Sequence, residues 1–343
     1  MNKKMGSPAV VGIIPNPDSG KDIRRIVTNA LVMGNREKVN LVRCLLIGLH
    51  AAGVDNVQIM PDRFGIGQKA IDGLQRHQGE IVSGVTILDM DVSGTGKDTV
   101  LAAQLLRDDS ASCIVTLGGD GTVRLAGNNC GEIPILPVST GTNNVLPRFI
   151  DGTVAGLGVG YFVQQEPDER LNSCFRSKKL DIAVNGQIID GALVDVAVIQ
   201  GGVVGSKAVW EPEDIRQIFV TQAAPTNIGL SAVVGMLHPI SAHDPIGGAL
   251  ELNQNGPARS VVAVIGPGLV SNIPFERFTY LEPGKHYPII DIRPLVLALD
   301  GEREIVLLAG DEATVSLNED GPWILYVEPA MKMAVENGFF TRK

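Results

Sequence analysis

The chain has 343 residues, 44% of them hydrophobic, and a formal net charge of −9 at pH 7. This length allows about two domains with substantial cores, and the acidic balance, without a long block of Lys and Arg, argues against nucleic-acid binding. No apolar run is long enough to cross a membrane, and the short run after Lys3-Lys4, which ends at Pro15, does not suit a signal peptide. The four cysteines include no C-x-x-C pair. We therefore expect a soluble, cytoplasmic protein without stable membrane association.

The first half of the chain alternates between apolar runs and amphipathic segments, which predicts a doubly wound, mostly parallel α/β domain over residues 1–150. Short apolar runs bounded by turn residues are typical of buried parallel strands. They lie at residues 9–14, 57–60, 85–88, 113–117 and 133–138. Helices are predicted from about residue 22, over 37–52, where apolar residues recur at helical spacing, and over 98–106.

The strand at 113–117 is followed by a glycine-rich loop, Gly118-Gly119-Asp120-Gly121-Thr122. Glycine permits close backbone approach, so successive N–H groups of such a loop can surround a phosphate. A carboxylate would repel that phosphate, so Asp120 is expected to hold Mg²⁺ or to accept a proton from an attacking hydroxyl. The alternative is a tight turn in which Asp120 caps the next helix.

Two further loops follow predicted strands. The strand at 133–138 leads into Ser139-Thr140-Gly141-Thr142-Asn143-Asn144. The strand at 9–14 leads into a loop in which Asn16 and Ser19 can contact phosphate, or which simply caps the following helix. Ligands of open α/β sheets bind at the carboxyl ends of the strands, so the loops together predict a site for phosphoryl transfer.

The second half predicts an all-β domain over residues 151–328. Asn-Gly and Asp-Gly turns separate its apolar runs at Asn185-Gly186, Asn255-Gly256 and Asp320-Gly321. We place the domain boundary in the glycine-rich stretch 151–160 and read 188–199 as one strand. The final segment, 329–343, is expected to pack back on the first domain. Asp300-Gly301 suits a hairpin turn, which can also project carboxylates into a cleft.

Two other patterns are set aside. Residues 93–99 resemble a P-loop, but Asp91 and Asp98 stand where Gly and Ser or Thr are required. His238 and His243 are close in sequence, yet no Cys or further His nearby completes a metal site.

Four motifs in the expected order resemble the superfamily that joins the ATP–NAD kinases with the diacylglycerol and sphingosine-type lipid kinases. G-G-D-G-T at 118–122 is its hallmark. Residues 16–20 resemble the lipid kinases' N-P-x-S-G, residues 140–144 their G-T-x-N-D, and residues 300–302 their D-G-E. The overall pattern most resembles the acetoin catabolism protein X branch. The resemblance implies a β-rich second domain, an active site between the domains, and a homo-oligomer.

The resemblance also implies a kinase that uses ATP or another polyphosphate donor, with Mg²⁺, and works mostly by positioning and electrostatic stabilisation. The donor phosphates would then be bound by Asn16, Ser19, Gly118, Gly119, Gly121 and Thr122. The nucleotide ribose and phosphates would be held by Thr140, Gly141, Thr142, Asn143 and Asn144. Asp120 would bind Mg²⁺ or act on the acceptor hydroxyl, and Asp300 or Glu302 would complete the carboxylate set.

The implied acceptor is soluble, with NAD first, since no basic or amphipathic segment suits docking on a membrane. ATP–NAD kinases bind NAD through an Asn-Glu pair, and its nearest equivalent here is Val194-Asp195. Another small metabolite linked to acetoin breakdown, a lipid, and a non-catalytic regulator that binds NAD or ATP are the alternatives. A dehydrogenase is disfavoured because G-x-G-x-x-G does not follow the first strand.

Overall fold

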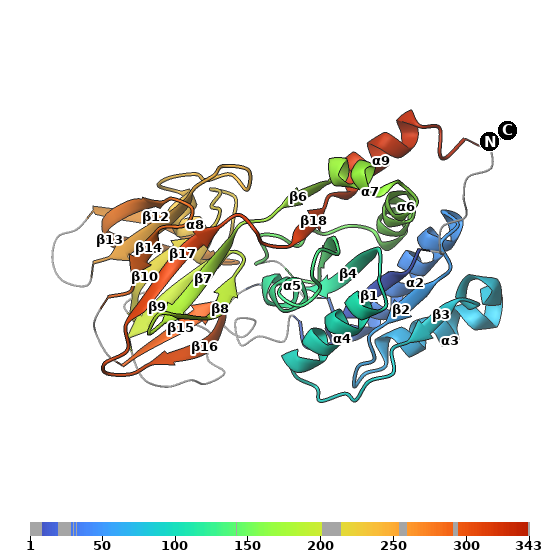
Figure 1. Cartoon of the computed structure of the whole chain (residues 1–343), viewed down its shortest axis with the longest axis horizontal. Helices are drawn as coiled ribbons and strands as arrows, with labels where there is room; N and C mark the ends of the chain where they lie inside the picture. The colour runs from blue at the N-terminus through green and yellow to red at the C-terminus, as the bar shows by residue number, and fades with distance from the viewer. Residues whose placement is uncertain are drawn as a thin grey trace.

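The computed structural model describes residues 9–19, 29, 31, 33–141, 143–200, 214–253, 259–290 and 294–341, without the side chains of residues 302–304. The chain forms an α/β domain and a β domain that lie side by side (Figure 1). The predicted helix from residue 22 and the turn at Asn255-Gly256 lie outside the described residues. Among the described helices, none is long and apolar enough to cross a membrane.

The α/β domain is built on a seven-stranded sheet with the order β3-β2-β1-β4-β5-β18-β6. Its strands are β1 (Val11–Pro15), β2 (Val57–Ile59), β3 (Val85–Ile87), β4 (Cys113–Gly118), β5 (Ile135–Ser139), β6 (Cys174–Arg176) and β18 (Trp323–Leu325). The first five are parallel, which confirms the predicted α/β class. β18 continues the parallel order beside β5, and β6 closes the edge antiparallel to it.

Helices cover both faces of this sheet. They are α2 (Asn35–Ala51), α3 (Ile66–Gln78), α4 (Gly96–Asp108), α5 (Asp120–Gly127), α6 (Gly152–Val163), α7 (Pro167–Arg170) and α9 (Val327–Glu336), with 3-10 turns at Gly79–Val82 and Leu171–Ser173. Side chains alternate across the strands, so Ile13 packs with α2, α3, α6 and α9, whereas Ile14 packs with α4 and α5. The sequence analysis did not predict α3.

The glycine-rich stretch 151–160 is not a linker. It forms most of α6, and its glycines let α6 approach α2 closely, because a Cβ added at Gly48 would lie 2.9 Å from the Gly156 Cα. The predicted domain boundary therefore differs from the structure. The chain leaves the α/β domain between β6 and β7, and it returns between β17 and β18.

The β domain consists of two antiparallel sheets that pack face to face. One has the order β12-β13-β11-β10-β9-β15-β16 and the other β14-β17-β7-β8. The strands are β7 (Lys179–Val184), β8 (Gln187–Ala192), β9 (Asp195–Gln200), β10 (Ile215–Val220), β11 (Gly247–Leu252), β12 (Arg259–Gly266), β13 (Leu269–Leu281), β14 (His286–Pro288), β15 (Leu295–Leu299), β16 (Glu302–Leu307) and β17 (Ala313–Asn318). Buried side chains such as Leu180, Val198 and Leu297 fill the space between the sheets. The outer face of the larger sheet is covered by α8 (Leu230–Gly235).

The run at 188–199 is two strands rather than one. β8 ends at Ala192 in the smaller sheet, and β9 begins at Asp195 in the larger sheet. Leu193 and Val194 carry the chain from the smaller sheet to the larger one, which we call the step between the sheets, and both are buried. No Pro or Asn-Gly turn within the run marks this change of sheet, so the sequence predicts a single strand.

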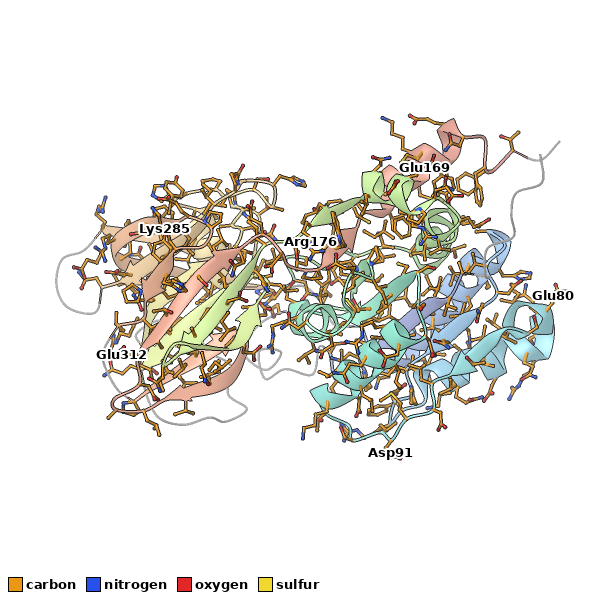
Figure 2. All side chains as sticks on the ribbon, viewed as in Figure 1. Glu80, Asp91, Glu169, Arg176, Lys285 and Glu312 are labelled. Carbon is orange, nitrogen blue, oxygen red and sulfur yellow. The ribbon has the colours of Figure 1, made fainter. Side chains whose placement is uncertain are left out.

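Two chain segments connect the domains and are bonded to each other. Gly321 N donates to Ser177 O, and Ser177 N donates to Pro322 O, each at 3.0 Å. Arg176 lies at this junction (Figure 2) and forms an ion pair with Glu132 of the α/β domain. The Trp323 indole N–H also donates to Glu132, at 3.0 Å.

Candidate functional site

The three loops predicted to bind phosphate lie together at the carboxyl ends of β1, β4 and β5. The Asn16 side-chain amide donates to Thr122 Oγ1 at 2.9 Å. The hydroxyls of Ser19 and Thr140 are 2.8 Å apart, and the Thr140 N–H donates to the Gly118 carbonyl at 3.3 Å. Three segments that are remote in sequence thus form one continuous surface.

Lys38 on α2 organises the first of these loops. Its side chain is fully buried, and Nζ donates to the carbonyl oxygens of Asn16, at 2.8 Å, and Ser19, at 3.0 Å. The loop also closes on itself, because the Asn16 side-chain oxygen accepts the N–H groups of Asp18 and Ser19. Lys38 carries no signal of this role in the sequence, since a lysine near the start of an amphipathic helix is usually solvated.

The glycine-rich loop packs against the loop after β5, and two of its glycines have no room for a side chain. A Cβ at Gly118 would lie 2.3 Å from Thr122 Oγ1, and one at Gly119 would lie 2.8 Å from Asn144 Oδ1. The Asn144 amide in turn donates to Ser139 Oγ at 2.7 Å and to the Gly141 carbonyl at 3.1 Å. Gly121 lies within the first turn of α5.

Asn143 of the loop after β5 offers an acceptor toward the site. Asn143 has a buried side-chain oxygen without a hydrogen-bond partner in the described part of the chain. Such an acceptor is available to a ligand hydroxyl or amide. Thr142 lies outside the described residues.

Asp120 is the first residue of α5 and is buried. Its Oδ2 accepts the N–H of Val145 and its Oδ1 accepts the N–H of Leu146, both at 2.9 Å. The carboxylate therefore holds the segment after β5 in place. The alternative of a tight turn in which Asp120 only caps the next helix does not include this role. A carboxylate oxygen can accept two bonds, so accepting these two N–H groups is compatible with a proton or a metal ion at Asp120.

A magnesium site at Asp120 is compatible with the chemistry of the residues present. Within the described residues, no group of three or more His, Cys, Asp or Glu side chains is arranged to hold a metal. Mg²⁺ in phosphoryl-transfer sites commonly takes one or two carboxylates and completes its shell with substrate phosphates and water. Asp120, beside the loops predicted to bind phosphate, fits that pattern.

Asp300 does not face an open cleft. It lies in the turn between β15 and β16, with a positive φ of 48°, and its carboxylate is fully buried. It accepts the N–H groups of Leu193, Val194 and Asp195 at 2.8 to 3.1 Å. Burial raises the pKa of this carboxyl, and Arg124 and the three amides oppose that rise. The structure thus assigns Asp300 to holding the step between the two sheets, while the side chain of Glu302 lies outside the described residues.

Val194 is the nearest equivalent of the Asn in the Asn-Glu pair of the ATP–NAD kinases. Its side chain points into the core. Its side chain is 1% exposed and packs in the apolar cluster of α4 and α5. Its carbonyl oxygen accepts the Thr221 N–H at 3.0 Å. A hydrogen bond from a side-chain amide to a ligand is therefore unavailable at this position.

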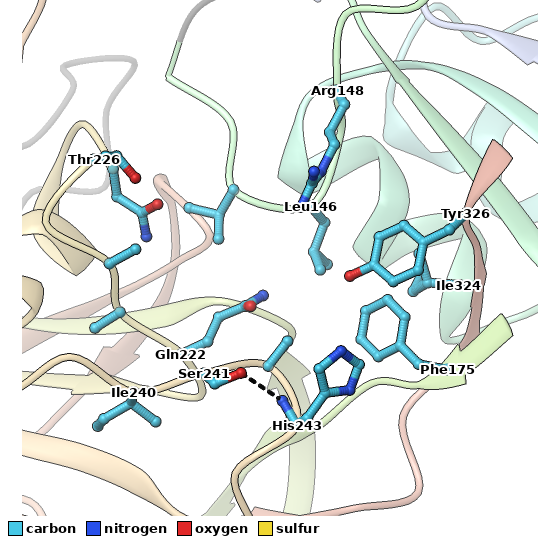
Figure 3. A pocket seen from close by; sticks show the side chains of 15 residues that line it. Leu146, Arg148, Phe175, Gln222, Thr226, Ile240, Ser241, His243, Ile324 and Tyr326 are labelled. Carbon is cyan, nitrogen blue, oxygen red and sulfur yellow. Dashed lines mark hydrogen bonds between the residues drawn. The ribbon is translucent and has the colours of Figure 1, made fainter. Parts of the chain in front are cut away.

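A cavity of about 320 Å³ lies between the two domains (Figure 3). The α/β-domain side is formed by Val145, Leu146, Arg148, Phe175, Ile324 and Tyr326, and the β-domain side by residues 222–224, 226, 227 and 240–243. The rings of Phe175 and Tyr326 are stacked at 4.8 Å, and the His243 ring meets the edge of Phe175 at 5.4 Å. A concave, partly aromatic cavity between domains is a common form of small-molecule site.

The cavity adjoins the glycine-rich loop directly. Val145 and Leu146, which line it, are the residues whose N–H groups bind the Asp120 carboxylate. Sequence analysis predicted the interdomain location from family resemblance, but it named no lining residue except His243, which it considered only as a metal ligand. Aromatic and amide residues scattered over the chain carry no local signal of a shared cavity.

Lys178 holds the β-domain side of the cavity in place. It is 5% exposed, and Nζ donates to the carbonyl oxygens of Ser241, Asp244 and Ile246 at 3.0, 2.8 and 2.6 Å. Burial lowers the pKa of this ammonium to about 8, and Asp244 and Glu319 oppose the change. The segment that carries Ser241 and His243 is thus shaped around one buried lysine.

Sequence comparisons divide the chain as the structure does. Residues 11–156 match the ATP-NAD kinase N-terminal domain family, and residues 178–320 match the acetoin catabolism protein X C-terminal domain family. Acetoin catabolism protein X of Cupriavidus necator is 37% identical over 319 residues, which cover 90% of this chain and 88% of that protein.

Among solved structures, yeast NADH kinase complexed with NADH superimposes with a TM-score of 0.50 at 14% sequence identity. The match covers 99% of this chain and 90% of that one. A putative diacylglycerol kinase from Bacillus anthracis is 12% identical with a TM-score of 0.45, over 93% of this chain and 97% of that one. The chain therefore has the NAD kinase-like fold that the motifs predicted.

Proposed function

The chain belongs to the acetoin catabolism protein X family, and we propose that it is an ATP-dependent kinase that phosphorylates a hydroxyl of a soluble acceptor. One observation carries the proposal. Asp120 of the glycine-rich loop is bonded through two backbone amides to residues that line the interdomain cavity. A donor bound at the loops and an acceptor bound in the cavity would meet at Asp120.

The residues of the three loops would position the donor. Gly118 and Gly119 allow the nucleotide phosphates to approach the backbone, and the hydroxyls of Ser19, Thr122 and Thr140 offer hydrogen bonds. Mg²⁺, when bound, would neutralise charge that develops on the transferred phosphoryl group. Asp120 would share in holding that ion or accept the proton of the acceptor hydroxyl.

NAD is the leading acceptor. The yeast NADH kinase that shares the fold is complexed with NADH, which supports a nicotinamide dinucleotide here as well. The buried Val194 means that NAD would be held by groups other than the Asn-Glu pair, and the cavity offers Gln222 and Asn227 amides for that purpose. Another small hydroxylated metabolite, including one linked to acetoin breakdown, would use the same cavity.

A non-catalytic nucleotide-binding regulator is the second candidate. It is favoured by the burial of Asp300, whose carboxylate is bonded to backbone amides and is withdrawn from the loops. A cytoplasmic location and a homo-oligomer remain predictions for either candidate.

The test is transfer from γ-labelled ATP, with Mg²⁺, to NAD and to a panel of soluble alcohols. Asp120→Asn should lower the rate at least ~100-fold if the carboxylate accepts the proton. Asp98→Asn is the matched control, because Asp98 is also a buried carboxylate that accepts backbone N–H groups, at Ser93 and Gly94. Tight ATP or NAD binding without transfer to any acceptor would reject the kinase and leave the regulator.

A further inference from the structure

Several polar side chains line the interdomain cavity. Among the described residues, the side chains of Arg148, Gln222, His243 and Tyr326 make no hydrogen bond or ion pair, although all four line the cavity. Figure 3 shows the Arg148 and Tyr326 side chains on one side of the cavity and Gln222 opposite them. Several uncommitted polar groups that converge on one cavity are a mark of a ligand site.

Arg148 is the best placed of these groups. Its backbone is fixed at the end of β5, because Ser139 N donates to the Arg148 carbonyl at 2.9 Å and Arg148 N donates to the Pro137 carbonyl at 3.3 Å. Its guanidinium carbon lies 5.5 Å from the centre of the Tyr326 ring, a distance that allows a cation–π interaction. Tyr326 is itself stacked on Phe175, so a rigid aromatic surface supports the guanidinium.

The charge around Arg148 favours an anion. The residues that line the cavity include no Asp or Glu, and Arg148 is the permanent cation among them. The Asp120 carboxylate lies behind the backbone of Val145 and Leu146 and is occupied with their N–H groups. The Asp244 carboxylate accepts the Ser241 N–H at 2.7 Å and does not line the cavity. In a chain with a net charge of −9, the residues that line this cavity carry a net positive charge.

We infer that the acceptor carries an anionic oxygen group, a phosphate or a carboxylate, and that Arg148 selects it. The inference rests on the proposed function in that it names the substrate class of the same site. A guanidinium offers two parallel N–H donors that match two oxygens of such a group. The Tyr326 hydroxyl and the Gln222 amide add donors from two sides. An anion held there lies next to the segment bonded to Asp120, and its neighbouring hydroxyl would face the donor.

The test is a calorimetric titration of the full chain with the donor site saturated by Mg²⁺ and a non-hydrolysable ATP analogue. The probes are NAD, glycerol 3-phosphate against glycerol, and lactate against propane-1,2-diol. These arms distinguish a dinucleotide pyrophosphate, a phosphomonoester and a carboxylate. We expect at least one anionic probe to bind ~10-fold or more tightly than an uncharged alcohol, and its affinity to fall as salt is raised.

Substitutions assign the effect to Arg148. Arg148→Gln should lower the affinity for the anionic probe ~10-fold or more. Arg148→Lys should keep part of the affinity, because the positive charge remains although the two parallel N–H donors of the guanidinium are lost. Arg277→Gln removes the same charge from an exposed arginine on β13, which pairs with Glu251, and should change nothing. Arg148 is exposed, so these variants should unfold at the same temperature as the unmodified chain.

Each outcome bears on the inference separately from the kinase proposal. Equal binding of charged and uncharged probes, no binding of any anionic probe, or unchanged affinity in Arg148→Gln would overturn the inference. Anion binding that depends on Arg148, without phosphoryl transfer to any probe, would support the inference and reject the kinase. Phosphoryl transfer to an uncharged alcohol, at the same rate in Arg148→Gln as in the unmodified chain, would support the kinase and overturn the inference.

Discussion

The Arg124 guanidinium and the Asp300 carboxylate face one another in the protein interior, with Nε 3.7 Å from Oδ2 and side-chain exposures of 1% and 0%. Arg124 lies on α5, one turn after Asp120, and Asp300 lies in the β15–β16 turn of the β domain. Arg124 Nη1 also lies 3.3 Å from both carboxylate oxygens of Asp190 on β8. The helix that begins with the glycine-rich loop is thus secured to both sheets of the β domain.

Asp300→Ala should mainly reduce stability. It would leave three backbone amides without their acceptor and would take one of two nearby carboxylates from the buried Arg124, and removing one partner of a buried pair costs ~3–5 kcal/mol. Urea unfolding measures this loss, and Asp72→Ala, which truncates an exposed aspartate on α3, is the control. Loss of transfer activity in Asp300→Asn or Asp300→Ala with unchanged stability would instead return Asp300 to the chemistry.

Gly119→Ala should disturb the donor loops. The added Cβ would lie 2.8 Å from Asn144 Oδ1, so Asn144 would have to move away from Ser139 and Gly141. Overpacking of this kind costs ~1–3 kcal/mol, and ATP affinity should fall with it. Gly79→Ala is the matched control, because a Cβ there meets nothing within 4 Å and the backbone is helical. Equal ATP affinity in both variants would mean that the Gly119–Asn144 contact does not shape the nucleotide site.

Lys178→Met should act on the acceptor side alone. The variant leaves the carbonyl oxygens of Ser241, Asp244 and Ile246 without their donor, so the segment that lines the cavity loses its anchor. We expect KM for the acceptor to rise ~10-fold, from loss of charged hydrogen bonds of ~1.5–3 kcal/mol, with KM for ATP unchanged. Lys332→Met, at an exposed lysine of α9, is the control. A parallel rise in both KM values would show general unfolding rather than a local effect.

Stability should fall in alkaline solution because of three cysteines. Burial raises the pKa of the Cys113 thiol and raises the pKa values of Cys130 and Cys174 to about 12. Unfolded thiols ionise from about pH 8.5 upward, so above that pH the unfolded chain binds fewer protons than the folded chain. The stabilisation is complete below that pH and is lost as the pH rises toward 12, by up to ~1.4 kcal/mol per pH unit for each thiol.

Unfolding free energies measured from pH 7 to pH 10 test this expectation. Cys174→Ser should show a shallower decline than the unmodified chain, because one of the three thiols is gone. Parallel curves for the two proteins would mean that Cys174 titrates alike in the folded and unfolded chains.

Much of the α/β domain could be predicted because its signals are local. Short apolar runs such as 113–117 mark buried strands, and Gly118 and Gly119 mark a loop where no Cβ fits. The structure confirms the fold class and brings the loops at Asn16, Asp120 and Thr140 together, since parallel strands place their carboxyl ends at one edge of the sheet. Local patterns misled at 151–160, where glycines serve close helix packing, and at 188–199, where one apolar run serves two sheets.

The sequence by itself determined the fold class, the glycine- and threonine-rich loops that follow the strands and the family resemblance, since each depends on residues that are neighbours in the chain. Only the tertiary structure decided that Asp300 is buried against Arg124, that Lys38 and Lys178 hold loops by their carbonyl oxygens, and that Arg148 faces a cavity between the domains. The physical reason is that a polar side chain's role depends on which groups surround it after folding. Those groups come from segments that are remote in sequence, as for Arg124 and Asp300, or from a separate loop, as for Lys38, and they leave no trace in local spacing.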